Sequence, residues 1–328
     1  MDALLEGVAA RNGGYFTRAE ALDHSYSDRE LAAACRSGVL RHIRHGAYAP
    51  AELYDSCDEV GRHLILARAA LARQRGAVAL TGVSAAAAHG LWLYGHDLTT
   101  VDLVRLDGGS SRHEVWARHH VVRDDVARHL QLLNGLPVTS LARTVWEVAG
   151  RTSLEAAVST ADSAYRLDPD LPQRLQEMEA VFARWPGSRQ ARMAISMMDR
   201  RSGSPGESYS RVVFRRHGVP APELQYPVMD STGRTLGVCD FGWEDDRHLG
   251  EFDGKIKYGR LLRTGEGAED VVFREKVRED TIRGELWGMS RWIMADLQRA
   301  NVRNFVQRLN ADRVRSRRLY TRNRAIFT

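Results

Sequence analysis

Charged residues gather on one short stretch of the chain, HLGEFDGKIKY at 248–258. If this stretch is a strand, Glu251, Asp253, Lys255 and Lys257 share one face, because side chains alternate between the two faces of a strand. Burying four charges is costly unless they are paired or bound to a metal. Carboxylates of this kind suit Mg²⁺ or Mn²⁺, which keep several waters and bridge to phosphate. A neighbouring lysine would orient the attacking water or neutralise charge in the transition state.

Two further acids precede this strand. Glu207 lies in a predicted helix at about 205–217, and Asp240 lies in a predicted strand at 235–243. A charged turn at 244–247 would join the two strands into a hairpin. An acid on a helix, an aspartate in a hairpin and an acid-x-Lys pattern on the next strand together form the arrangement of a site for a hard cation.

Each of these residues also fits a plainer interpretation. Glu207 completes a capping box at the start of its helix, Asp240 fits a surface acid near a turn, and the strand charges could pair with each other. The lysine content favours the metal site. Only three of the 47 basic residues are lysines: Lys255, Lys257 and Lys276. A lysine that persists in an arginine-rich chain marks a position that needs a compact ammonium group.

The region from 204 to 297 resembles the PD-(D/E)xK nuclease superfamily, in particular its very-short-patch-repair-like endonuclease branch. The resemblance implies a restriction-endonuclease-like α/β domain that cleaves DNA with Mg²⁺ or Mn²⁺. Its implied catalytic residues are Glu207, Asp240, Glu251, Asp253 and Lys255. Asp240 would hold the metal together with Glu251 or Asp253. Either acid could be the primary ligand, because Asp253-Gly254-Lys255 fits acid-x-Lys directly, whereas Glu251 lies in the EFDG pattern of that branch.

The N-terminal 50 residues have the pattern of helix, turn, helix and β-hairpin. Thr17 with Glu20, and Ser27 with Glu30, form capping-box patterns that open two helices. VLRHIRHGAYAP then turns at Gly46. This order predicts a winged helix-turn-helix, whose second helix enters the major groove of DNA. The expected DNA contacts come from the second helix and the wing: Arg29, Arg36, Arg41 and Arg44.

The segment GGYFTRAEALDHSYSDRELAAACRSGVLRHIRHGAYAP resembles the N-terminal domain of the AbiEi-like type IV antitoxin family. The resemblance implies a winged helix that binds operator DNA, and it implies a cognate toxin or defence partner. Residues 1–50 contain six arginines and six acids, so a protein-contact role for the same fold remains open.

The fold class predicted for the whole chain is α+β and multidomain. The expected parts are a winged helix-turn-helix at 1–50, an antitoxin-like middle α/β domain at 51–165, a helical linker at 166–203, a PD-(D/E)xK nuclease-like α/β domain at 204–298 and an Arg-rich C-terminal tail at 299–328. In the middle domain, the spacing of four histidines matches no metal site, and no partner carboxylate is evident: His113, His119, His120 and His129. We expect this domain to act as a scaffold.

Composition narrows the class of protein. With 43% hydrophobic and 27% charged residues the chain is globular, and its three separated cysteines exclude a disulfide framework. No run approaches the roughly 20 apolar residues of a membrane span, so we expect a cytoplasmic protein. Nine arginines against one acid in 299–328 suggest a polyanionic partner, with a solvated helix as the alternative. Lys257 and Lys276 are further candidates for DNA contact.

The leading hypothesis is therefore a metal-dependent DNA endonuclease in defence or repair. A non-catalytic DNA-binding regulator of the antitoxin type is the alternative, and a protein-interaction scaffold is the third possibility.

Overall fold

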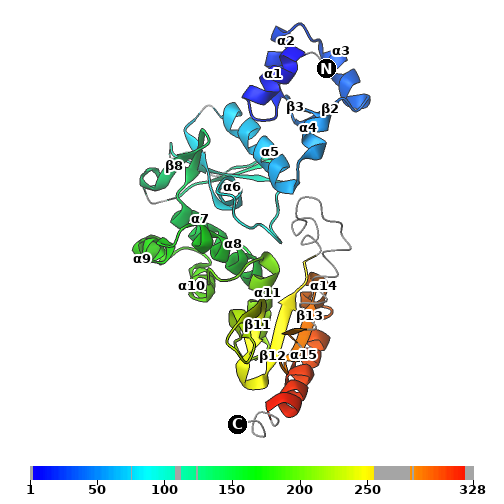
Figure 1. The fold of residues 1–328 in the computed structure, drawn as a ribbon. Helices are drawn as coiled ribbons and strands as arrows, with labels where there is room; N and C mark the ends of the chain where they lie inside the picture. The colour runs from blue at the N-terminus through cyan, green and yellow to red at the C-terminus, as the bar shows by residue number, and fades with distance from the viewer. Residues whose placement is uncertain are drawn as a thin grey trace. The chain divides into compact units, whose positions relative to one another are not determined.

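A computed structural model describes residues 3–74, 76–107, 112–122, 125–254, 281–282 and 284–321 of the chain. Lys255, Lys257 and Lys276 lie outside these residues. The chain divides into two compact units (Figure 1). The first unit comprises 1–160 with 167–196, and the second comprises 161–166 with 197–328. Among the helices described, none is long and apolar enough to cross a membrane.

The first unit begins with the predicted helix, turn, helix and hairpin. Its elements are α1 (Ala3–Arg11), β1 (Phe16–Thr17), α2 (Arg18–Asp23), α3 (Asp28–Arg36), β2 (Leu40–Arg44) and β3 (Ala47–Pro50). The strands form an antiparallel sheet in the order β1-β3-β2. Both predicted capping boxes are present, at Thr17 and at Ser27. Leu5, Phe16 and Leu31 are buried where the helices meet the sheet.

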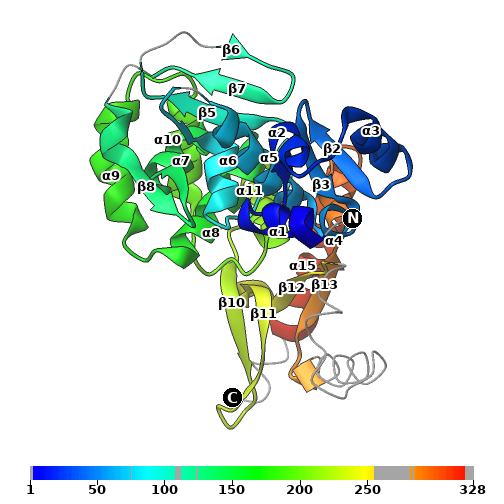
Figure 2. The same ribbon diagram turned by 90° about the horizontal axis from the view of Figure 1, so that it is seen from above.

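The rest of the first unit is built around a six-stranded mixed sheet in the order β6-β7-β5-β4-β9-β8. Its strands are β4 (Val78–Leu80), β5 (Val101–Arg105), β6 (Arg112–His113), β7 (Ala117–His120), β8 (Leu130–Leu133) and β9 (Leu136–Thr139). Figure 2 shows β6 and β7 at one edge of this sheet. The helices are α4 (Ala51–Ser56), α5 (Glu59–Arg73), α6 (Gly82–Ala88), the short η1 (Val126–His129), α7 (Leu141–Ala149), α8 (Leu154–Leu167), α9 (Leu171–Phe182) and α10 (Ser188–Met197). Alanines of α5 and α6 pack on buried Leu80 and Val101.

One helix boundary differs from the prediction. Continuous apolar spacing predicts a single helix over 54–74, but the structure has two helices, α4 and α5. Asp58 separates them, because its backbone is extended and its side chain accepts a hydrogen bond from the Gly61 N–H at 2.7 Å. An aspartate that caps a new helix in this way overrides the apolar period.

The second unit contains a four-stranded sheet in the order β10-β11-β12-β13. Its elements are α11 (Pro205–Arg216), β10 (Glu223–Met229), β11 (Thr235–Trp243), η2 (Glu244–Asp246), β12 (His248–Phe252), β13 (Gly288–Trp292), α14 (Met294–Leu297), α15 (Val302–Ser316) and η3 (Arg317–Thr321). The first three strands are antiparallel, and β13 runs parallel to β12. The predicted helix at about 205–217 and the first hairpin strand are thus present, whereas the second strand ends at Phe252 and does not include Asp253 as predicted.

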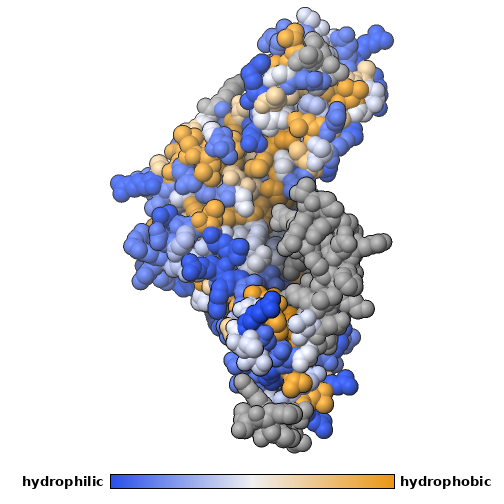
Figure 3. Space-filling model, in the orientation of Figure 1, coloured by the Kyte–Doolittle hydropathy of each residue, from blue (hydrophilic) through white to orange (hydrophobic). Residues whose placement is uncertain are grey.

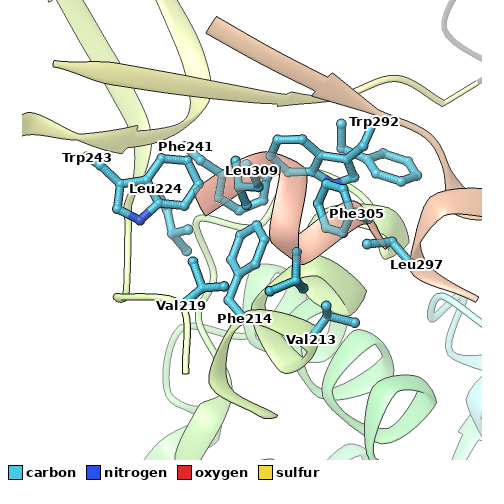
Figure 4. Close-up of a cluster of buried hydrophobic side chains, with 12 residues drawn as sticks. Val213, Phe214, Val219, Leu224, Phe241, Trp243, Trp292, Leu297, Phe305 and Leu309 are labelled. Atoms are coloured by element: carbon cyan, nitrogen blue, oxygen red, sulfur yellow. The ribbon is translucent and has the colours of Figure 1, made fainter. Parts of the chain in front are cut away.

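Aromatic side chains join α11 and α15 to one face of this sheet. Phe214 lies at the centre of the cluster, with ring centroids of Phe241, Trp243, Trp292 and Phe305 within 5.4–6.5 Å (Figure 4). The first turn of α11 also packs closely against β12. A Cβ atom at Gly206 would lie 2.0 Å from the Phe252 ring, so only glycine permits this approach.

The expected Arg-rich tail needs correction over its described part. Residues 302–316 form α15, which buries Phe305, Val306 and Leu309 in the core of the second unit. Arg313 is also buried, and its guanidinium donates to the carboxylate of Asp246. This part of the chain is therefore a core helix. The prediction of a tail rested on the number of arginines and did not take the apolar face of this helix into account.

Candidate functional site

Helix α3, the second helix of the helix-turn-helix pattern, presents two arginines to solvent. Leu31 is buried, whereas Arg29, Ala33 and Arg36 are exposed on the opposite side. Arg29 and Arg36 are seven residues apart, which is about two helical turns, so they share a face. Neither guanidinium forms an ion pair with any part of the chain that the structure describes. On the side shown in Figure 3, hydrophilic and hydrophobic residues are mixed over this part of the surface.

The two acids beside Arg29 are both engaged. The Asp28 carboxylate accepts hydrogen bonds from Arg18 Nε and Nη2 at 2.6 and 2.5 Å, and these bonds lower the pKa of Asp28. The Glu30 carboxylate accepts from the Ser27 hydroxyl at 2.7 Å and from its N–H at 2.8 Å, and the pKa of Glu30 is lowered by these bonds. The first turn of α3 thus carries two occupied carboxylates and one available guanidinium.

The wing provides fewer cations than predicted. Arg41 is half-exposed and pairs with Asp55 at 2.5 Å. Arg44 is buried, donates to the Ala69 carbonyl at 2.8 Å and lies over the Trp116 ring. Arg44 is therefore not available to phosphate, which corrects the expectation. The reason is a register shift in the β2–β3 ladder just before Arg44, because a one-residue shift sends a side chain to the other face.

In the second unit, Glu207 closes the start of α11. Its carboxylate is buried and accepts from Gly203 N at 2.6 Å, Ser204 Oγ at 2.9 Å and Gln225 Nε2 at 3.0 Å. The plainer interpretation of Glu207 as a capping residue is confirmed. Gln225 has a φ of 53° inside β10, which is uncommon for a residue other than glycine. No sequence pattern indicated this residue.

Asp240 and Glu251 lie on neighbouring strands. The β11–β12 ladder pairs Phe241 with Gly250, and the next step along it places Asp240 across from Glu251. Asp240 Oδ2 accepts from the Phe252 N–H at 2.8 Å. Glu251 forms an ion pair at 2.9 Å with Arg291, its register partner on β13. One basic partner of the strand charges is therefore an arginine from β13, which sequence reasoning missed.

The remaining predicted site residues are less closely grouped. Asp253 follows the end of β12, where its N–H donates to the Trp292 carbonyl at 2.8 Å. Within the described ranges, no group of three or more His, Cys, Asp or Glu residues could hold a metal ion. Two carboxylates still fit Mg²⁺ or Mn²⁺, since magnesium is commonly bound by one or two carboxylates together with water and phosphate. Lys255 and Lys257, on the same predicted strand face, lie outside the described residues.

The arginines of α15 and η3 fall into two groups. Arg313 and Arg317 both pair with Asp246, and Arg308 lies 3.4 Å from Asp296. The second group is exposed, and it makes no ion pair with the described part of the chain: Arg303, Arg315 and Arg318. Only this second group is available to a polyanion.

Two of the four middle-domain histidines, His119 and His120, have carboxylate neighbours, contrary to the expectation. His120 Nε2 lies 2.8 Å from Asp102 Oδ1 on the parallel neighbour strand, and buried His119 lies 3.6 Å from Glu114. The Asp102 partner comes from pairing between β5 and β7, which linear spacing does not show, whereas Glu114 lies in the connection between β6 and β7. The contact between His120 and Asp102 joins β5 to β7, and the scaffold role of this domain stays a prediction.

Comparison with known proteins identifies the class of the N-terminal domain. Residues 5–51 match the family model described as "Transcriptional regulator, AbiEi antitoxin". The first unit therefore begins with an AbiEi-type regulator domain, as the sequence indicated. The matched segment contains α2, α3 and the wing, so it includes the exposed arginines of α3.

Two mycobacterial proteins resemble a larger part of the chain. They are "Uncharacterized protein Rv2248" of Mycobacterium tuberculosis strain H37Rv and "Uncharacterized protein MT2308" of strain CDC 1551. Each is 32% identical over 229 residues, which cover 69% of this chain and 78% of the relative. The chain belongs to the same family as these proteins. The match of residues 5–51 to the regulator family favours a regulator over a nuclease, for which none of these matches gives support.

Proposed function

We propose that this protein binds duplex DNA through α3 and acts as a regulator of the AbiEi antitoxin type, with a cognate toxin as its protein partner. The exposed pair Arg29 and Arg36 on one face of α3 carries the proposal. An α-helix fits the major groove, and arginine is the side chain that most often contacts bases and phosphates there. The match to a transcriptional-regulator family over the same residues supports this role.

The test is equilibrium binding of the purified protein to duplexes selected from a random pool. Removing both side chains, as Arg29→Ala with Arg36→Ala, should weaken binding at least tenfold, because each arginine supplies about 1 kcal/mol or more. Arg184→Ala is the matched control, since Arg184 is exposed near the end of α9. Equal affinity of the double variant and the control would remove α3 from the interface.

A second candidate function is metal-dependent hydrolysis of DNA by the second unit. One observation favours it: Asp240 and Glu251 face each other on neighbouring strands, next to Arg291. With Asp253 and Lys255 these residues form the proposed catalytic set, whereas Glu207, which caps α11, is left out of it. A bound Mg²⁺ or Mn²⁺ would supply Lewis-acid activation of water and of the phosphate. Asp240 and Glu251 would hold the ion, and Lys255 would orient the attacking water or neutralise negative charge in the transition state.

The second candidate is tested by a cleavage assay on plasmid DNA with Mg²⁺ or Mn²⁺, and with chelator. Asp240→Asn should abolish cleavage, since it removes the negative charge that attracts the ion. Asp230→Asn is the control, because Asp230 lies at the turn of the β10–β11 hairpin, where its carboxylate only accepts hydrogen bonds from Thr232 and Arg234. Absence of cleavage by the parent protein would leave the regulator role as the function.

A further inference from the structure

We infer that Arg29 reads a guanine in the major groove, that Arg36 contacts only phosphate, and that the Arg18–Asp28 ion pair masks a negative charge that would otherwise oppose binding. This inference rests on the proposed DNA binding by α3 and assigns separate roles to residues of that surface. It starts from an anomaly: the helix that would enter the groove begins with an acid, Asp28.

Arg18 connects three parts of the winged helix. Arg18 is the first residue of α2, and Asp28 is the first residue of α3. Two hydrogen bonds join their side chains, at 2.6 and 2.5 Å. The Arg18 N–H also donates to the carbonyl of Gly46 in the turn of the wing, at 2.9 Å. One residue therefore connects the start of the recognition helix to the helix before it and to the wing.

The exposure of this pair indicates what it does. The side chains of Arg18 and Asp28 are 49% and 62% exposed. Ion pairs as exposed as this one contribute little to stability. An uncompensated carboxylate at the groove-facing end of α3 would repel phosphates and the acceptor groups of bases. Neutralising Asp28 is therefore of more use to DNA binding than to the fold.

The positions of Arg29 and Arg36 on α3 suit different contacts: a base edge for Arg29 and a phosphate for Arg36. The N-terminal residues of a recognition helix contact base edges. Arg29 is the second residue of α3, whereas Arg36 is the last, about 10 Å farther along the axis. The fork of Arg29 matches the O6 and N7 acceptors of guanine. Neither Asp28 nor Glu30 is available to accept from cytosine, because Arg18 and Ser27 occupy their carboxylates.

The first arm of the test measures the affinity for the selected duplex and for a random duplex at several salt concentrations. Arg29→Ala should lose about tenfold to a hundredfold on the selected duplex and little on the random one. Arg29→Lys should lose the preference but keep the salt dependence, because it retains the charge without the fork. Arg36→Ala should lower the slope of log affinity against log salt by about 0.9 and keep the preference.

The second arm is a double-mutant cycle. Arg18→Ala should weaken binding to both duplexes by roughly three- to tenfold, the effect of one uncompensated surface charge near phosphate. Adding Asp28→Asn should restore the loss, whereas Asp28→Asn alone leaves the Arg18 charge unpaired and should strengthen binding by a similar factor. Thermal unfolding of each variant checks that the winged helix remains folded.

The outcomes separate this inference from the function on which it rests. Failure of the parent protein to bind any duplex overturns both. Binding by the parent, with the sequence preference retained in Arg29→Ala, overturns only the assignment of Arg29. Binding by Arg18→Ala that Asp28→Asn does not restore overturns the charge mask, because a merely structural link would not be repaired by removing a charge.

Discussion

The surface of α3 and the acid site of the second unit differ in how their charges are arranged. On α3 the acids are bound to neighbours and two arginines remain available. In the second unit the acids Asp240 and Glu251 lie on adjacent strands, and an arginine from a third strand pairs with one of them. We propose a polyanion as the partner of the first arrangement and a cation as the partner of the second. The comparison shows that net charge, which is zero over residues 1–50, says less about a partner than which charges are already paired.

The largest expected effect tests whether the two regions are independent. Phe214→Ala removes the ring at the centre of the second unit's aromatic cluster. Loss of a buried phenylalanine of this kind costs about 3–5 kcal/mol. The variant should lose that much stability in denaturant unfolding of the second unit, while the affinity of α3 for DNA stays unchanged. A parallel loss of DNA affinity would show that the two units form one cooperative structure.

A smaller effect separates the two groups of arginines in α15 and η3. Arg313→Ala leaves the buried carboxylate of Asp246 with Arg317 alone, and we expect a loss of about 1–3 kcal/mol. The triple alanine variant of Arg303, Arg315 and Arg318 should keep its stability. If these three arginines contact phosphate, the triple variant should lower the slope of log affinity against log salt by roughly 2.7. Chemical denaturation and salt-dependent binding give the two readouts. An unchanged slope in the triple variant would confine DNA binding to the first unit.

The smallest effect concerns pH and the capping of α3. Hydrogen bonds from the Ser27 hydroxyl and N–H lower the pKa of Glu30 in the folded protein. A lowered folded pKa stabilises the fold above the unfolded value, near 4.3, and this contribution is lost as the pH falls through the folded pKa. The first unit should therefore lose stability below about pH 4. Glu30→Gln should flatten this dependence, since it keeps a capping side chain without titrating. Thermal midpoints between neutral and acidic pH would show the difference, and identical profiles would contradict it.

Features that depend on residues close together in the sequence could be predicted, whereas those that depend on distant residues could not. Both capping boxes are local, so Thr17 and Ser27 could be placed from the residues around them. The burial of Arg44 could not, because a shift in strand register causes it. The pairing of Glu251 with Arg291 joins residues 40 positions apart, and no spacing indicates it. Such contacts depend on which strands become neighbours.

Two other differences between prediction and structure could have been found from nearby residues. The apolar residues Phe305, Val306 and Leu309 have helical spacing, and they predict a buried face in the segment taken for a basic tail. Asp58 is a natural capping residue inside the run taken for one helix. The positive φ of Gln225 has no such signal, since its side chain reaches Glu207 from another element.

The central claim is that α3 binds duplex DNA through its unpaired arginines. The most direct measurement is fluorescence anisotropy of a labelled duplex, selected from a random pool, titrated with the parent protein and with the Arg29→Ala, Arg36→Ala double variant. The account predicts saturable binding by the parent and at least a tenfold weaker affinity for the double variant, with the Arg184→Ala control unchanged. Equal affinity of all three proteins, or no binding by the parent, would contradict it.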